Sequence, residues 1–301
     1  MIGTARRSSS QWRAVRRYWP ALVFLLPTAL SLVVFRLVPL LTAVDNSFYD
    51  VNLIRGDRKF IGIENFTRAF SDSDFLLSAK NTTVYALTKV PVQVAVALGF
   101  AVLVNRRLRG IVIVRSAIFL PVVTSLVVAS TIWLFIFDPN SGLINSLFVG
   151  VGLPPQGLLH DANQALPAII GMMVWKEVGL STLFFLAGLQ SIPTEYYEAA
   201  RIDGANPWSS FKFITLPLLR GTLLFVLVIE TVFAFRVFAP VYVMTQGGPL
   251  DATSVVVFYI YEQAFPFNSV GYATALSLIL LVAITAATLV LRRIVGRVVQ
   301  Y

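Results

Sequence analysis

The chain has 301 residues, of which 57% are hydrophobic and 13% are charged, about half the charged fraction of an ordinary soluble domain. The mean hydropathy is +0.77, and the apolar residues form long blocks, as in polytopic membrane proteins. Without cysteine and with one histidine, His160, the chain has no disulfides and we expect no metal site. The net charge of +9 comes from arginines beside apolar blocks, which indicates membrane topology and not a nucleic-acid surface.

The apolar blocks predict an all-α membrane protein with six transmembrane helices, because about 20 apolar helical residues cross a bilayer core about 30 Å thick. The first block follows a basic start and resembles a signal peptide. It is too long for one, and no small-residue cleavage motif follows it, so we expect a retained span. The predicted spans are 19–44, 82–104, 111–137, 166–190, 221–243 and 270–291.

The basic residues predict the orientation. Loops 138–165 and 244–269 contain no Lys or Arg, whereas cytoplasmic loops are expected to be basic. We therefore expect a bacterial inner-membrane protein with both termini in the cytoplasm. Its parts are the N-terminus (1–18), the transmembrane domain (19–293), a cytoplasmic loop (191–220) and the C-terminus (294–301). The arginines that decide this are Arg6, Arg7, Arg13, Arg16, Arg17, Arg106, Arg107, Arg109, Arg292, Arg293 and Arg297.

Two loops on the opposite side have apolar character. In loop 45–81, four side chains recur at helical spacing, which favours packing at the membrane interface over a binding role; they are Phe60, Ile63, Phe66 and Phe70. A turn at Gly247, Gly248 and Pro249 ends the fifth span. The stretch 253–265 is then too short to cross the bilayer, so we expect a re-entrant or interfacial helix.

Charged residues inside the spans are candidate functional residues, because burying a charge in lipid is costly. Arg115 lies near a cytoplasmic end and is expected to snorkel, and for Arg36 and Lys89 we favour snorkelling or structural pairing over ligand contact. Four charges lie in the middle of spans 4 and 5, and Phe233 shares a helical face with one of them. They form either a buried ion-pair network or a polar and aromatic substrate pocket; the four are Lys176, Glu177, Glu230 and Arg236.

The chain contains no recognisable catalytic motif. It has no Gly-Lys dipeptide and hence no phosphate-binding loop, no Gly-x-Ser-x-Gly elbow and no His-Glu-x-x-His motif. We therefore expect a non-catalytic chain that binds no ATP or cofactor of its own. A polytopic membrane enzyme and a secondary transporter are the alternatives, although neither catalytic carboxylates nor internal repeats are evident.

The segment 195–219 between spans 4 and 5 is polar and predicts a helical elbow outside the membrane. Pro193 suits the first turn of a helix, and Gly204 suits its C-terminal end. Asn206 and Pro207 then read as the N-cap and first position of a second short helix, with Phe211 and Ile214 on its inner face.

The elbow carries a family resemblance. "EAARIDGA" at 198–205 with "ITLPLL" at 214–219 resembles the cytoplasmic loop of permease subunits of binding-protein-dependent ABC importers. The match is closest to the carbohydrate-uptake branch, which includes the maltose and glycerol-3-phosphate importers. Further stretches support it and extend it over nearly the whole chain: "FIGIENF" at 60–66, "RRLRGIVIVRSAIFLPVV" at 106–123, "TQGGP" at 245–249 and "YEQAF" at 261–265.

The resemblance implies a type I importer permease fold that imports a sugar or a similar solute, with a glycerol phosphate or glycerophosphodiester as the alternative. It implies as partners a second homologous permease, two copies of an ATP-binding subunit that holds ATP and Mg²⁺, and an extracytoplasmic solute-binding protein or lipoprotein. The elbow would dock on the ATP-binding subunit through Glu198, Ala199, Ala200, Asp203, Gly204 and Ala205. The maltose importer's sugar-lining positions match Lys176, Glu177, Leu180, Glu230 and Phe233, and we add Ser125 and Arg236 to this predicted substrate pathway.

Overall fold

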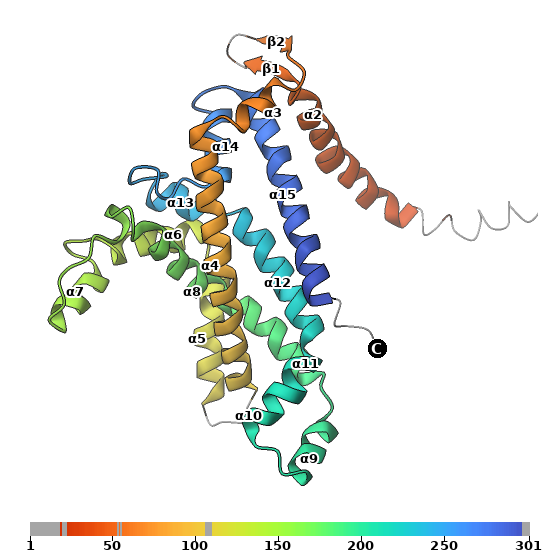
Figure 1. Cartoon of the computed structure of the whole chain (residues 1–301), viewed down its shortest axis with the longest axis vertical. Helices are drawn as coiled ribbons and strands as arrows, with labels where there is room; N and C mark the ends of the chain where they lie inside the picture. Colours follow the sequence, from red (N-terminus) through yellow and green to blue (C-terminus); the bar gives the residue numbers. More distant parts are fainter. Residues whose placement is uncertain (1–18, 20–22, 53, 55, 106–109, 297–301) are drawn as a thin grey trace, which may run out of the picture.

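The computed structural model describes residues 19, 23–52, 54, 56–105 and 110–296. The predicted N-terminal segment 1–18, Arg106, Arg107, Arg109 and Arg297 lie outside these residues. The described chain is an elongated helical bundle (Figure 1). The end of the bundle that carries helices α9 (Thr194–Ile202) and α10 (Pro207–Ser210) is called the elbow end, and the opposite end is called the hairpin end.

Among the described residues, five helical segments are long and apolar enough to cross a membrane. A sixth crossing is obtained if α5 (Ile111–Val123) and α6 (Leu126–Ile136) are counted as one span, although they are bent by 105°. The backbone is extended at Thr124 and Ser125, which breaks the helix that the apolar run 111–137 predicts. The other segments are Val23–Asn46, α4 (Ser73–Val104), α8 (Ala165–Gln190), Arg220–Met244 and α15 (Val270–Gly296).

Several of these segments have internal breaks. The first contains a π-helix, η1 (Val33–Leu37), followed by α2 (Val38–Asn46). The segment Arg220–Met244 consists of α12 (Arg220–Phe235) and α13 (Ala239–Met244), which are separated by three residues. Further short elements lie between the spans; they include α7 (Leu143–Gly150), η2 (Leu158–His160), η3 (Phe211–Thr215), α11 (Leu216–Leu218) and α14 (Val256–Ala264).

The hairpin end differs from the sequence prediction. Strands β1 (Tyr49–Asn52) and β2 (Asp57–Phe60) form an antiparallel hairpin with Tyr49 opposite Phe60. The helical spacing predicted for Phe60 is therefore wrong, because Phe60 ends a strand and helix α3 (Glu64–Ala69) begins only after it. Phe60, Ile63 and Phe70 are all more than 60% exposed, as side chains at a membrane interface can be.

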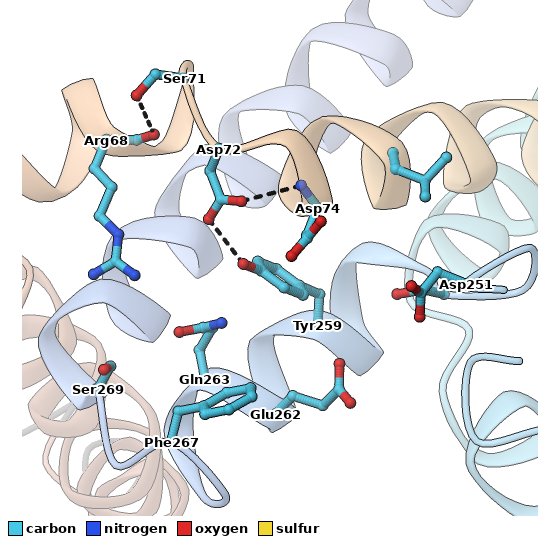
Figure 2. A pocket seen from close by; sticks show the side chains of 12 residues that line it. Arg68, Ser71, Asp72, Asp74, Asp251, Tyr259, Glu262, Gln263, Phe267 and Ser269 are labelled. Carbon is cyan, nitrogen blue, oxygen red and sulfur yellow. Dashed lines mark hydrogen bonds between the residues drawn. The ribbon is translucent and has the colours of Figure 1, made fainter.

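Helix α4 begins nine residues before the predicted span. Asp72 is its N-cap, and the side chain accepts hydrogen bonds from the backbone amides of Asp74 (3.1 Å; Figure 2) and Phe75 (3.3 Å). Residues 73–81 therefore extend the helix beyond the apolar run that predicted it. This extension carries the residues that hold the loop after α13.

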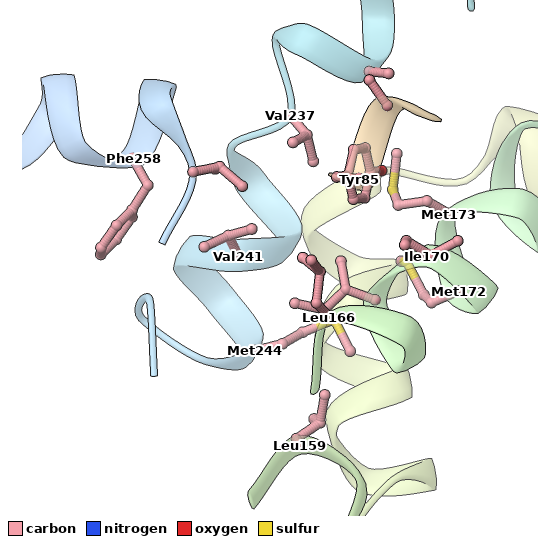
Figure 3. Packing of buried hydrophobic residues seen from close by; sticks show 14 of the residues in the cluster. Tyr85, Leu159, Leu166, Ile170, Met172, Met173, Val237, Val241, Met244 and Phe258 are labelled. Carbon is pink, nitrogen blue, oxygen red and sulfur yellow. The ribbon is translucent and has the colours of Figure 1, made fainter. Parts of the chain in front are cut away.

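The core lies between α4, α8 and the α12–α13 segment. Buried apolar side chains from these elements and from α14 pack together (Figure 3). Gly179 lets α5 approach α8 closely, since a Cβ atom there would lie 2.4 Å from the carbonyl oxygen of Ile118. The cluster includes Tyr85, Ile169, Ile170, Met172, Val237, Val241, Met244 and Phe258.

Candidate functional site

Three charged side chains from three different helices meet in the bundle. Lys89 of α4 is fully buried, and its Nζ donates hydrogen bonds to Glu177 Oε2 of α8, at 2.6 Å, and to Glu230 of α12. Ser181 Oγ of α8 donates to the other oxygen of Glu230. We call Lys89, Glu177 and Glu230 the charged triad. With all three members ionised its formal charge is −1.

Other polar groups of α4 surround the triad. Tyr85, Lys89 and Gln93 are spaced four residues apart and therefore share one face of the helix. Gln93 Nε2 donates to Ser181 Oγ at 3.3 Å. Tyr85 Oη and Gln93 Oε1 have no hydrogen-bond partner among the described residues, and such buried groups are uncommon outside functional or strained sites. This face of α4 therefore carries two polar atoms, Tyr85 Oη and Gln93 Oε1, that no hydrogen bond with the triad or its neighbours occupies.

A cavity of about 340 Å³ opens beside the triad. The side chain of Glu177 is 23% exposed, whereas those of Lys89 and Glu230 are 1% and 2% exposed. Glu177 is therefore the member of the triad that reaches the cavity. The lining residues are Leu126, Met173, Glu177, Phe233, Arg236, Val237, Phe238, Ala239 and Pro240.

The predicted pathway residues do not all gather there. Lys176 Nζ instead donates to the carbonyl oxygen of Val122 at 3.1 Å, because successive helical residues point in different directions, and it supports the α5–α6 bend. Ser125 is exposed at the N-cap of α6, and Leu180 is half-buried; neither lines the cavity. Arg236 is exposed at the end of α12 and makes no ion pair with a described residue.

Lys89 completes the site. The sequence analysis favoured snorkelling or structural pairing for it, and the structure shows pairing, with the two carboxylates of Glu177 and Glu230. Arg36, in contrast, is exposed on the first segment. Arg115 donates to the carbonyl oxygen of Val104 at 2.8 Å, which ties the start of α5 to the end of α4.

At the elbow end, α9 stops where the sequence predicts. Gly204 has a φ of +77°, its N–H donates to the carbonyl of Arg201 (3.1 Å), and Ala205 N–H donates to the carbonyl of Ala200 (2.8 Å). These two bonds form a Schellman motif, in which glycine is favoured. Asn206 caps α10 by accepting a hydrogen bond from Ser209 N–H at 2.8 Å. Pro193 precedes α9 as its N-cap and does not lie in the first turn.

The surface of the elbow is polar with a few exposed apolar side chains. Glu198, Ala199, Asp203 and Gly204 are exposed, and Ala200 and Ala205 are half-buried. Ile202 and Trp208, which the sequence analysis did not single out, are 87% and 70% exposed. Apolar residues in a polar segment are the signal that could have revealed them. Tyr197 Oη and Thr215 Oγ1, 2.9 Å apart, join α9 to η3.

The loop after α13 is held to α4 at the hairpin end. Gly247 has a φ of +84°, and the Gly248–Pro249 peptide bond is cis. Asn81 Nδ2 donates to the carbonyl oxygens of Asp251 and Ser254, both at 2.9 Å. Two further contacts reinforce this, from Ser78 to Ser254 and from Val256 N–H to Thr82 Oγ1. Helix α14 is thus a separate short helix, as predicted for 253–265.

Within the described part of the chain, no three His, Asp or Glu side chains are placed to hold a metal ion. The cavity instead offers one carboxylate, one guanidinium and two aromatic rings. Carboxylate and guanidinium groups accept and donate hydrogen bonds, respectively, and aromatic rings cover apolar faces of a ligand. The arrangement is suited to binding a polar organic solute and contains no evident nucleophile.

Comparison with known proteins gives consistent matches. At 35% identity, the chain resembles the probable ABC transporter permease protein YesP of Bacillus subtilis (strain 168), over 97% of this chain and 95% of that protein. The arabinooligosaccharides transport system permease protein AraP of the same strain is 34% identical over 91% and 88% of the two chains. The sn-glycerol-3-phosphate transport system permease protein UgpA of Agrobacterium fabrum (strain C58) is 36% identical over 80% and 83%.

A solved structure of a bacterial ABC transporter that imports the acidic polysaccharide alginate contains a similar chain. It has a TM-score of 0.86 at 23% identity and covers 97% of this chain and 100% of that one, so it shares the fold. The family described as the inner membrane component of binding-protein-dependent transport systems matches residues 90–300, well over half of the chain. The chain is therefore a multi-pass inner-membrane transport permease and belongs to that family.

Proposed function

We propose that this chain is the membrane-spanning subunit of an ATP-driven importer for a sugar or an oligosaccharide. The observation that carries the proposal is the position of Glu177, whose carboxylate is paired with Lys89 on one side and open to an aromatic-lined cavity on the other. A carboxylate held in this way accepts hydrogen bonds from hydroxyl groups, while Phe233 and Phe238 cover apolar ring faces. The transport systems of the relatives AraP and of the alginate importer are named for carbohydrates.

The elbow would couple transport to ATP hydrolysis on another subunit. Its exposed residues include Glu198, Asp203 and Gly204, and the Schellman motif and the Asn206 cap give them a defined shape. Ile202 and Trp208 add apolar area of the kind that a protein partner covers. Two sites so far apart can be linked only if both bias the same conformational equilibrium. ATP and Mg²⁺ would be held by the ATP-binding subunit.

The assembly would contain this chain, a second homologous permease, two ATP-binding subunits and an extracytoplasmic solute-binding protein. A solved alginate ABC transporter in complex with its periplasmic protein supports the last of these. The elbow end would face the cytoplasm, because the end of α15, which carries Arg292 and Arg293, lies toward it. The hairpin end would then face the binding protein.

A glycerol phosphate is the alternative substrate, and one observation favours it. Arg236 lines the cavity without an ion-pair partner among the described residues, so it could bind a phosphate. The UgpA relatives are named for sn-glycerol-3-phosphate transport. Against this alternative, Glu177 in the same cavity repels an anion.

The test is solute uptake by the complete complex in liposomes supplied with its binding protein and ATP. We expect ATP-dependent uptake of labelled neutral oligosaccharides, and a large loss of uptake in Glu177→Gln with normal assembly. Arg236→Gln separates the two substrates, because it should abolish uptake of glycerol-3-phosphate but only weaken that of a neutral sugar. Uptake of glycerol-3-phosphate alone would overturn the sugar assignment, and ATP-independent uptake would overturn the importer.

A further inference from the structure

A second cavity, of about 730 Å³, lies at the hairpin end, far from the charged triad. It is formed by the α3–α4 junction, the loop after α13, helix α14 and the turn before α15 (Figure 2). We call it the acidic pocket. Its lining residues are Arg68, Ser71, Asp72, Asp74, Leu77, Asp251, Ser254, Tyr259, Glu262, Gln263, Phe267 and Ser269.

The pocket contains four carboxylates and one guanidinium. Asp72 is already satisfied, because Tyr259 Oη donates to it at 2.8 Å and Tyr272 Oη at 2.6 Å. The guanidinium of Arg68 lies over the ring of Tyr272, 4.1 Å from its centroid, and forms no ion pair with a described residue. The pocket therefore carries more negative charge than the described residues neutralise.

The three other carboxylates, of Asp74, Asp251 and Glu262, lack a cationic partner in the described part of the chain. Burial and the neighbouring charges of Asp251 and Asp74 raise the pKa of Glu262. A positive charge placed in the pocket would favour the ionised form of Glu262. The loop 244–269, which supplies Asp251 and Glu262, contains no Lys or Arg that could offset them.

A buried amide provides an independent sign of a ligand. Gln263 is only 6% exposed, and its side chain makes no hydrogen bond to any residue that the structure describes. Figure 2 shows this amide in the middle of the pocket, among Arg68, Tyr259 and Phe267. The amide opens onto the pocket, where a ligand or water can satisfy it. Its oxygen is suited to accept a hydrogen bond from an N–H donor.

The arrangement of the carboxylates and aromatic rings indicates which kind of cation the pocket binds. The carboxylates do not form a group that could hold a metal ion, so one small ion cannot neutralise them together. A guanidinium or ammonium group on a flexible chain can reach several of them, and the rings of Tyr259 and Phe267 offer apolar and cation–π contacts. Phe267 is 62% exposed at the rim, where an incoming side chain would pass.

We propose that the acidic pocket receives an arginine or lysine side chain of the extracytoplasmic solute-binding protein when that protein docks on the hairpin end. The proposal rests on the proposed function, which supplies the partner and the orientation. The pocket would fix the position and orientation of the docked binding protein, because the energy of a desolvated charge pair changes strongly with small displacements of its two charges. Charge complementarity of this kind also speeds association.

The test uses the complete complex in lipid nanodiscs and measures the ATPase activity as its solute-loaded binding protein is titrated. The variant Asp74→Asn/Glu262→Gln should raise the half-saturating concentration of binding protein about tenfold or more, since it removes two charges that face the docked cation. ATPase activity without binding protein and at saturation should be unchanged. The matched control is Asp50→Asn, an exposed carboxylate of β1 outside the pocket, which should leave the titration unchanged.

A mutant cycle identifies the partner residue. Each exposed Arg and Lys of the binding protein is changed to Ala, and one of these variants should lose affinity with wild-type permease but not with Asp74→Asn/Glu262→Gln. The proposal would be overturned if wild type and the double variant had equal half-saturating concentrations of binding protein. The proposal would also be overturned if size-exclusion chromatography showed that the double variant does not assemble, or if spermine activated the ATPase in the absence of binding protein. A wild-type complex that no binding protein stimulates would instead contradict the proposed function.

Discussion

The ammonium group of Lys89 lies 2.6 Å from the carboxylate of Glu177, although 88 residues separate the two in the chain. The same ammonium group also contacts Glu230, 141 residues away, so α4, α8 and α12 share one charge centre. Buried ion pairs contribute little net stability, but removing one partner is costly. The triad therefore favours one arrangement of the three helices.

Lys89→Met should destabilise the complex, because it leaves two buried carboxylates without a counter-charge. We expect a loss of about 3–5 kcal/mol in the free energy of unfolding. Denaturant titration of the purified complex in detergent measures it. Lys89→Met/Glu230→Gln is the informative comparison, since it removes the buried excess charge and should recover part of the loss. A double variant as unstable as the sum of the two single variants would contradict the triad as a unit.

Asn81→Ala should loosen the loop after α13. The substitution removes the side-chain donor from the carbonyls of Asp251 and Ser254, at a cost of about 1–3 kcal/mol, although the Asp251 carbonyl keeps the N–H of Ser254 at 3.1 Å. Hydrogen exchange followed by mass spectrometry should show faster exchange in residues 245–256. Thr83→Ala is the control, because its hydroxyl is exposed and bonds only to the carbonyl of Ala79 on the same helix. Equal exchange in wild type and Asn81→Ala would refute the anchoring role.

Gly204→Ala should destabilise the elbow by about 1 kcal/mol, because a side chain is disfavoured at a φ of +77°. Space is not the obstacle, since a Cβ atom there would meet nothing within 4 Å. Gly221→Ala is the matched control: its Cβ would also be unobstructed, and its φ is not positive. Limited proteolysis of residues 194–215 should be faster only in Gly204→Ala; equal rates in the two variants would argue against the Schellman motif.

Asp72 predicts a pH-dependent contribution to stability. Burial opposes its ionisation, but hydrogen bonds from Tyr272, Tyr259 and two backbone amides outweigh this and lower its pKa below 3.8. A lowered pKa in the folded state stabilises the protein above pH 3.8, and this contribution is lost as the pH falls through the lowered value. Asp72→Asn should thus be less stable by about 1 kcal/mol at pH 7, with the difference shrinking toward pH 3. Thermal unfolding of wild type and Asp72→Asn at pH 7 and pH 3 measures the difference in stability. A difference that does not change with pH would exclude the charge of Asp72 as its cause.

The sequence predicted the features that local rules determine. Apolar blocks located the spans, and Gly204 and Asn206 marked the ends of short helices, because caps and breakers act within a few residues. The charges at 177 and 230 were also visible as costly residues in apolar segments. Lys89 was visible in the same way, but its pairing with these two carboxylates was not, since helical periodicity gives the face of a side chain but not which distant helix it meets.

Tertiary structure decided the remaining features. Lys176 and Glu177 are adjacent in the chain, yet only Glu177 reaches the triad, and Lys176 supports the α5–α6 bend. That bend lies in a continuous apolar run, where hydropathy carries no signal for a turn. The acidic pocket joins four segments separated by up to about two hundred residues, so no local pattern could reveal it. The β1–β2 hairpin was missed because its strands are short and polar.

The most direct test of the account is the coupling ratio between solute transported and ATP hydrolysed in liposomes containing the complete complex. Gly204→Asp and Glu198→Lys each place a new charge on the elbow surface without touching the triad. We predict that both variants assemble and hydrolyse ATP but lose most solute uptake and the stimulation by binding protein. Wild-type uptake at the wild-type ratio in both variants would contradict the account.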